Sequence, residues 1–178
     1  MQLSDQDKKK LHEIARQTIA AGLQGQTPSP LKDNTGVLGE PRGAFVTLHL
    51  QGCLRGCIGL IEAVKPLAET IQEMALSAAF CDPRFPPLKA QEFKDLDIEI
   101  SVLTPLRRIK NIEEIQVGVH GLYLRNGSYR GLLLPQVATE HKWDRDTFLQ
   151  QTCYKAGLPS LAWKDPKTEI YVFSADIF

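Results

Sequence analysis

Hydrophobic residues recur along this chain with two different spacings, and each spacing predicts a type of secondary structure. A period of two, in which every second residue is apolar, is typical of a half-buried strand. It is clearest between Ala44 and Gln51, where alanine, valine and two leucines occupy alternate positions. The stretches with this pattern are 44–51, 96–104 and 170–173.

Two turn signals predict that further strands form hairpins. Asn126-Gly127 separates 121–125 from 129–134 and is a strong signal for a tight turn. Gln51-Gly52-Cys53 predicts a short turn after the first strand, so that the chain returns through the next six residues. This hairpin would place Cys57 on a strand near the middle of the sheet. His49 would lie opposite Cys57 only if the register permits.

A period near 3.6 predicts three helices. Ser4 and Asp7 resemble a capping box at the start of the first helix, and Gly25 would stop it. Pro66 suits the first position of the second helix. Asp144 can cap the third, which Gly157 would end. The predicted ranges are 4–24, 66–80 and 144–156.

The order of these elements predicts an α+β fold. A length of 178 residues suits one domain, which could contain two lobes. A strand pair precedes a main helix in both halves, and this order suggests an internal structural duplication. The stretch 27–42 holds three prolines and two glycines, which predicts a loop or extended arm.

Composition narrows the functional classes. Lys and Arg number 21, as do Asp and Glu, so the formal net charge is +0 and bulk attraction to nucleic acid is unfavoured. No apolar run is long enough to span a bilayer, and the N-terminus is not signal-like. The four cysteines, at positions 53, 57, 81 and 153, are too few for a disulfide framework. We expect a cytoplasmic protein with free thiols.

The six residues Leu54 to Gly59, LRGCIG, concentrate the candidate chemistry. Cys57 is a strong nucleophile as a thiolate, and a nearby cation such as Arg55 would favour that form. Gly56 and Gly59 allow something to approach the main chain closely. A simpler interpretation is a glycine-bent strand with a buried, inert cysteine.

Metal binding is a weaker alternative. Cys53 and Cys57 could join His120 and His141 in a zinc site. However, an extended chain separates residues four apart by about 13 Å, so two thiols on one strand could not share an ion. We therefore assign no metal ligand and no cofactor.

Five blocks of this sequence resemble the AMMECR domain family, whose bacterial and archaeal members are called AmmeMemoRadiSam system protein A. The blocks stand in the family's order and extend over most of the chain, from about Gly43 to Trp163. They are LRGCIG at 54–59, DPRFPPL at 82–88, HGL at 120–122, GLLLPQVA at 131–138 and KAGL at 155–158.

The resemblance implies an α+β fold with a barrel-like sheet, flanking helices and a cleft beside LRGCIG. It also implies an accessory protein that acts with a radical-SAM enzyme and a Memo-like protein. Two functions stay open: a cysteine-dependent enzyme, or a non-catalytic binding or adaptor module for a peptide, a small molecule, an anion or a partner protein.

The candidate site residues come from the blocks. Cys57, His120 and Glu140 are candidates for catalysis. The candidates for binding a substrate or an anion are Arg55, Gly56, Gly59, Arg84 and Gln136. We expect these residues to converge on one cleft, because a shared site needs a concave surface. We also expect Arg55 or Arg84 to pair with an acidic side chain, since an unpaired cation is costly to desolvate.

Overall fold

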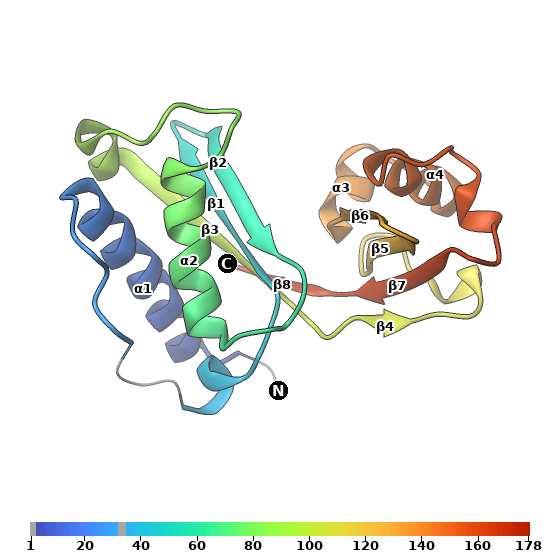
Figure 1. Cartoon of the computed structure of the whole chain (residues 1–178), viewed down its shortest axis with the longest axis horizontal. Coiled ribbons are helices and arrows are strands. Elements are labelled where there is room, and N and C mark those ends of the chain that lie inside the picture. The colour runs from blue at the N-terminus through green and yellow to red at the C-terminus, as the bar shows by residue number, and fades with distance from the viewer. Residues whose placement is uncertain (1–2, 32–34) are drawn as a thin grey trace. The chain divides into compact units, whose positions relative to one another are not determined.

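A computed structural model describes residues 3–31 and 35–178, and the chain divides into two compact units. The first unit extends to Leu103 and also includes Asp176–Phe178. The second comprises Thr104–Ala175. Each unit has its own sheet and its own hydrophobic core (Figure 1).

The first unit packs two helices on a four-stranded sheet of order β2-β1-β3-β8. β1 pairs antiparallel with β2 on one side and with β3 on the other. Two short 3₁₀ helices, η1 (Gly36–Gly39) and η2 (Ala90–Asp95), lie in its loops. The main elements are α1 (Asp5–Leu23), β1 (Ala44–Leu50), β2 (Cys53–Leu60), α2 (Leu67–Phe80), β3 (Leu96–Leu103) and β8 (Ala175–Ile177).

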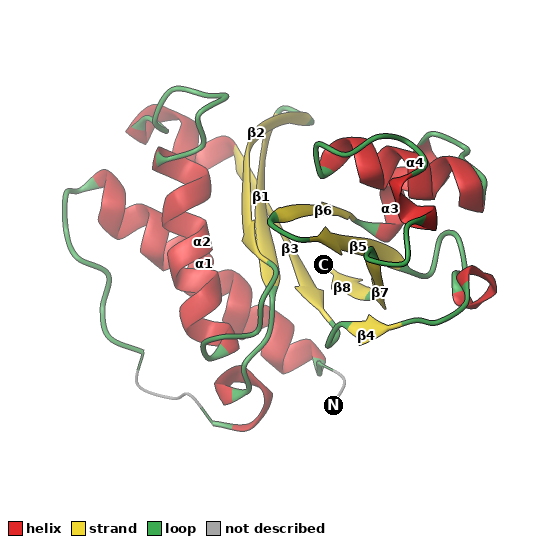
Figure 2. Ribbon diagram, turned by 45° about the vertical axis from the view of Figure 1, so that its right-hand side comes forward, coloured by secondary structure: helices red, strands yellow, loops and turns green. Residues whose placement is uncertain are grey.

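The predicted alternation in β1 determines which face of this sheet is covered. Ala44, Val46 and Leu48 have no exposed surface, and they belong to the core shared with α1 and α2. Figure 2 shows the two helices on one side of the sheet. Residues at the alternate positions of β1, Phe45, Thr47 and His49, are only partly buried. The second face of the sheet is therefore partly exposed, and polar side chains on it are accessible to other groups.

The second unit repeats this plan with a sheet of order β4-β7-β5-β6. Its core gathers apolar residues of α4, chiefly Phe148 and Leu149, against Leu122 and Leu124 of β5. The elements are β4 (Arg107–Arg108), η3 (Ile112–Glu114), β5 (Gly121–Asn126), β6 (Tyr129–Leu133), α3 (Pro135–Glu140), α4 (Arg145–Lys155), η4 (Ala162–Lys164) and β7 (Glu169–Phe173).

The two sheets share one topology, which agrees with the duplication that the order of elements suggested. In each unit a hairpin is followed by helical structure and then by a strand that pairs with the first strand of the hairpin. In the first unit that strand is β3, which pairs with β1, and in the second it is β7, which pairs with β5. The fourth strand of each sheet comes from the other half of the chain. β4 follows β3 but pairs with β7, whereas β8 follows β7 but joins β3. The described residues thus form two open sheets and not the single barrel-like sheet that we expected.

Most predicted elements are present, with small shifts at their ends. Ser4 and Asp7 form the capping box of α1, and Asp144 caps α4. Pro66 precedes α2 as its N-cap and is not its first residue. The strand of Cys57 lies at the edge of its sheet, not near the middle, because β3 takes the other side of β1.

The stretch 27–42 is a loop in part. Residues 32–34 of this predicted arm lie outside the described residues. Beyond them, η1 (Gly36–Gly39) forms a helical turn, and Val37 and Leu38 are buried in the core of the first unit. Within the described part of the chain, no helix is long and apolar enough to cross a membrane.

Candidate functional site

The register of the first hairpin sets the surroundings of Cys57. Gln51 and Gly52 have φ values of 52° and 76°, and they form a two-residue turn between β1 and β2. Cys57 lies opposite Thr47, and the register shifts between Leu48 and His49. His49 lies opposite Leu54, close to the turn, and not opposite Cys57.

Gly56 explains which way Cys57 faces. A Cβ atom on Gly56 would lie 2.2 Å from the carbonyl oxygen of Ala78, so only glycine lets β2 pack this closely on the backbone of α2. Neighbouring residues of a strand point to opposite faces. Cys57 therefore lies on the face turned away from α2, and it is partly exposed. Cys57 is thus not the fully buried cysteine of the simpler interpretation, and its reactivity stays a prediction.

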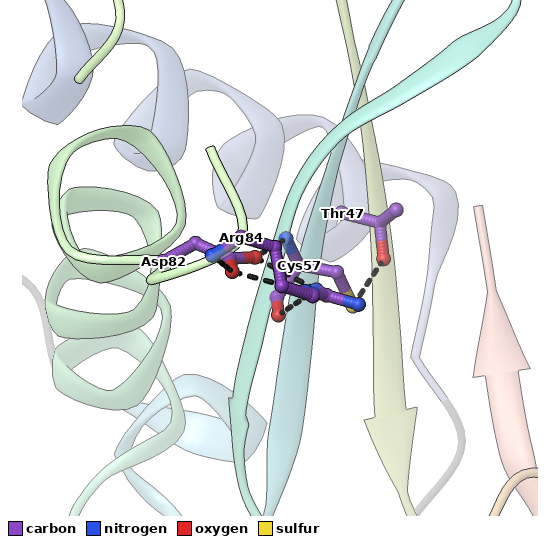
Figure 3. A network of polar contacts seen from close by, with 4 residues as sticks. All are labelled: Thr47, Cys57, Asp82 and Arg84. Carbon is purple, nitrogen blue, oxygen red and sulfur yellow. Dashed lines mark hydrogen bonds and ion pairs between the residues drawn. The ribbon is translucent and has the colours of Figure 1, made fainter. Parts of the chain in front are cut away.

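An ion pair binds the backbone of Cys57 on its outer side (Figure 3). The Cys57 N–H donates to Asp82 Oδ2 at 2.9 Å, and Arg84 Nη2 donates to the Cys57 carbonyl oxygen at 3.1 Å. Arg84 also donates to Asp82, from Nε at 3.0 Å and from Nη2 at 2.7 Å. Asp82 and Arg84 thus satisfy the backbone groups that an edge strand would otherwise leave unpaired.

This geometry also brings the Thr47 hydroxyl to the sulfur. Since the N–H and C=O of Cys57 point outward, Cys57 and Thr47 form a non-hydrogen-bonded pair, in which facing side chains lie closest. Thr47 Oγ1 donates to Cys57 Sγ at 3.3 Å. The sulfur therefore accepts a hydrogen bond from a hydroxyl, and the guanidinium of Arg84 is held beside the same residue by the Cys57 carbonyl oxygen (Figure 3).

The electrostatics follow from these contacts. Hydrogen bonds from the Arg84 side chain hold the pKa of Asp82 well below its usual range, although burial opposes this effect. The pKa of Arg84 is raised, chiefly by Asp82 and to a smaller degree by the Cys57 side chain. The Asp82 side chain is only 2% exposed, whereas that of Arg84 is 54% exposed. The carboxylate is thus a buried anchor, and the guanidinium is in reach of solvent.

Arg55 forms an ion pair of its own. It donates to both carboxylate oxygens of Glu92, at 2.8 and 3.1 Å, and its side chain is only 12% exposed. These bonds lower the pKa of Glu92. Both Arg55 and Arg84 pair with an acid, as we expected. However, Arg84, and not Arg55, is the cation at Cys57.

The remaining candidates belong to the second unit. His120 precedes β5, and its Nδ1 accepts the backbone N–H of Gln116 at 3.2 Å. Gln136 and Glu140 lie on α3, where Glu140 is exposed and the Oε1 atom of Gln136 is buried without a hydrogen-bond partner among the described residues. The convergence of these residues with Cys57 on one cleft stays a prediction.

The other cysteines occupy contrasting environments. Cys53 lies on β2 and Cys81 directly follows α2, and both are exposed. Cys153 is fully buried on α4, and burial raises the pKa of its thiol. Within the described residues, no group of three or more His, Cys, Asp or Glu side chains is placed to hold a metal ion.

Sequence reasoning did not include three residues of this network in the site. Thr47 could have been found, because it occupies the polar face of a predicted strand, but only with the correct register. Asp82 begins the DPRFPPL block, but it was not among the candidate site residues. Glu92 gave no signal, since its contact with Arg55 spans 37 positions of the chain.

The fold and the site define a class: an α+β protein of two topologically similar units, with a partly exposed thiol held at a sheet edge by an ion pair. The chain belongs to the AMMECR1 family, whose model matches residues 12–178.

Relatives of known sequence and structure agree with this assignment. A protein of Methanothermobacter thermautotrophicus is 48% identical over 99% of this chain and 95% of its own length. Protein NEQ441 of Nanoarchaeum equitans is 43% identical over 94% of this chain and 97% of its own. The crystal structure of the uncharacterized protein PH0010 from Pyrococcus horikoshii matches with a TM-score of 0.87 at 42% identity, covering 94% of this chain and 88% of that one.

Proposed function

We propose that Cys57 is the reactive group of this protein and acts as a thiol nucleophile. The observation that supports this is the use of a buried carboxylate, Asp82, to hold Arg84 and the backbone of Cys57 together beside a partly exposed sulfur. A cysteine that served only packing would not need a partly exposed sulfur.

The contacts support a simple covalent step. The thiol loses its proton to solvent, and the guanidinium of Arg84 and the hydroxyl of Thr47 stabilise the negative charge on sulfur. The sulfur electron pair then forms a bond to an electrophilic carbon of the substrate, whose leaving group departs with the bonding pair. The rigid attachment of Cys57 to Asp82 would keep the sulfur in position for this step.

A binding or adaptor module is the second candidate function. Arg84 favours it, because half of its side chain is exposed while its charge is anchored from behind by Asp82. Such a guanidinium can receive an anionic group of a peptide or small molecule. Arg55 is a poorer candidate for this, since Glu92 occupies its guanidinium and little of the side chain is exposed.

The partners belong to the same proposal. The family resemblance suggests a radical-SAM enzyme and a Memo-like protein, and we propose that the surface around Cys57 serves that association in the cytoplasm. Co-purification of the three proteins, compared between the natural chain and Cys57→Ser, tests this. Retention of both partners by Cys57→Ser at normal yield would count against a role for the thiol in assembly.

The reactivity of Cys57 can be measured against controls that the chain itself contains. Iodoacetamide labelling followed by peptide mapping gives a rate for each of the four cysteines. We expect Cys57 to react faster than Cys53 and Cys81, although those two are more exposed, because the guanidinium of Arg84 is held beside Cys57. Cys153 should be protected by burial.

A pair of arginine variants separates activation from exposure. Arg84→Gln should slow the labelling of Cys57, because the positive charge beside the residue is lost, while Arg84→Lys keeps the charge and should slow it less. Arg55→Gln is the matched control, because Arg55 also pairs with a carboxylate but does not contact Cys57. The role of Cys57 as a nucleophile would be refuted if Cys57 were labelled no faster than Cys53. It would also be refuted if Arg84→Gln and Arg55→Gln slowed the labelling of Cys57 equally.

A further inference from the structure

The second unit contains a cavity that the proposed function does not use. It has a volume of ≈ 580 Å³ and lies between the segment that follows β4 and the segment from η4 to β7. All of its lining residues belong to the second unit, whereas Cys57, Asp82 and Arg84 belong to the first. Sites for small molecules have volumes of about 300–1,000 Å³, so the cavity can accept a metabolite-sized ligand.

The charge of the lining favours an anion. Arg108, Lys110 and Lys164 contribute three positive charges, and Asp165 contributes one negative charge. The Nη1 atom of Arg108 lies 3.1 Å from Glu169, which partly balances its charge. Neither lysine forms an ion pair with another residue that the structure describes, and both are exposed. Two unpaired ammonium groups at one cavity are suited to a phosphate group.

The rest of the lining favours a flat, apolar group. Trp163 and three isoleucines, Ile109, Ile112 and Ile170, form the apolar part of the wall. The Trp163 ring lies under Lys164, whose Nζ is 4.9 Å from the ring centroid. An apolar and aromatic wall beside charged groups suits a ligand that has both an aromatic ring and an anionic end.

Trp163 also carries an unsatisfied polar atom. Its Nε1 is buried and has no hydrogen-bond partner among the described residues. A buried donor without a partner is unfavourable, and such atoms in folded proteins call for a specific explanation. Because this atom is buried, the indole would meet a ligand through its ring and not through its N–H.

From these observations we propose that the cavity binds a small ligand in which a phosphate group is attached to a planar heteroaromatic ring system, the chemistry of a mononucleotide. Lys110 and Lys164 would contact the phosphate, and Trp163 with the isoleucines would contact the ring. A bare anion would leave the apolar wall without a partner, and an uncharged aromatic would leave the two lysines without one. The neutral charge of the whole chain gives no reason to extend this site to a nucleic acid.

Isothermal titration calorimetry with adenosine monophosphate tests the proposal. Inorganic phosphate and adenosine serve as the two half-ligands. We expect one molecule of the nucleotide to bind per chain, at least about tenfold more tightly than either half, because each half forms only part of the contacts. Absence of nucleotide binding up to millimolar concentrations would overturn the proposal. Equal affinity for inorganic phosphate would overturn the assignment of the ring.

Variants determine whether any binding occurs in this cavity. The double substitution of Lys110→Gln and Lys164→Gln should weaken nucleotide binding by about tenfold or more. Lys167→Gln is the matched control, because Lys167 is exposed in the same loop but does not line the cavity. All three side chains are exposed, so circular dichroism should show an unchanged fold. Equal weakening by the control, or none by the double variant, would overturn the proposal.

Discussion

At the scale of single residues, the site depends on an edge strand that is capped by side chains. The outward N–H and C=O of Cys57 would be available to another strand, and Asp82 and Arg84 occupy them instead. This capping is a structural role that the ion pair has whether or not the thiol reacts. The two roles differ in what they predict, because capping alone gives no reason for a fast-reacting sulfur.

The capping role leads to a prediction about pH. The pKa of Asp82 is lower in the folded chain than the value of about 3.9 expected when unfolded. Its contribution to stability is therefore fully present above that value and is lost as the pH falls towards the folded pKa. Asp82→Asn should lower the free energy of unfolding by about 1–3 kcal/mol near neutral pH, because a buried carboxylate and its hydrogen bonds are lost while the exposed Arg84 can be solvated.

Denaturant unfolding between about pH 3 and pH 7 measures this effect. The difference between the natural chain and Asp82→Asn should be constant at the upper end and should shrink below about pH 4. Asp97→Asn, which removes an exposed carboxylate from β3 in the same unit, controls for the loss of charge. A difference that does not change with pH would mean that the Asp82–Arg84 pair does not have this role.

At the scale of elements, the two units use glycine in the same way. Gly56 of β2 faces the backbone of α2, and Gly131 of β6 faces the backbone of α4, where a Cβ atom would lie 2.5 Å from the Ala156 nitrogen. Both glycines occur on the second strand of a hairpin that packs under a helix. The shared topology of the units is thus accompanied by the same close contact between strand and helix.

Substitution of either glycine should therefore destabilise its own unit. Gly56→Ala and Gly131→Ala should each cost about 1–3 kcal/mol in the free energy of unfolding, because the added Cβ forces strand and helix apart. Gly56 does not have a positive φ, so the cost arises from crowding and not from backbone strain. Thermal and denaturant unfolding measure it. Cys53→Ala, at an exposed position of β2, is the control, and a Gly56→Ala chain as stable as that control would contradict the account.

Local sequence patterns predicted the elements better than the contacts between them. Alternation in 44–51 and the Asn126-Gly127 turn are local signals, and β1 and the β5–β6 hairpin formed as predicted. The register shift beside His49 has no comparable signal. Without it, the pairs counted back from Leu50 and Cys53 would place Val46, and not Thr47, opposite Cys57. The short strands β4 and β8 were missed because two or three residues carry no period. The Arg55–Glu92 pair depends on a loop path that no local pattern contains.

At the scale of the whole molecule, the chain exchanges strands between its halves. β8 follows β7 directly, yet it completes the sheet of the first unit, where the backbone groups of Phe178 and Ile100 bond to each other at 2.8 and 3.1 Å. The sequence predicted neither exchange, because the pairing partner of a strand is set by the whole fold. The last residues of the chain therefore contribute to the stability of the unit that contains the first helix.

Phe178 provides the test of this exchange. Its ring lies 5.4 Å from that of His12 and under Lys8, whose Nζ also pairs with Asp176 at 2.7 Å. Phe178→Ala should cost about 1–2 kcal/mol, the loss of a partly buried aromatic side chain. The exposed neighbour Ile177 supplies the control, Ile177→Ala, which should change stability little.

Hydrogen exchange shows where this loss of stability occurs. Since β8 belongs to the first sheet, amides of β3 and α1 should exchange faster in Phe178→Ala, although α1 lies at the opposite end of the sequence. Amides of β5 and β6 should keep their protection, because Phe178 belongs to the first unit. Faster exchange confined to β5 and β6 would show that the chain end stabilises the second unit instead. Faster exchange in β3 and α1 would establish that the strand exchange joins the two ends of the chain in one cooperative unit.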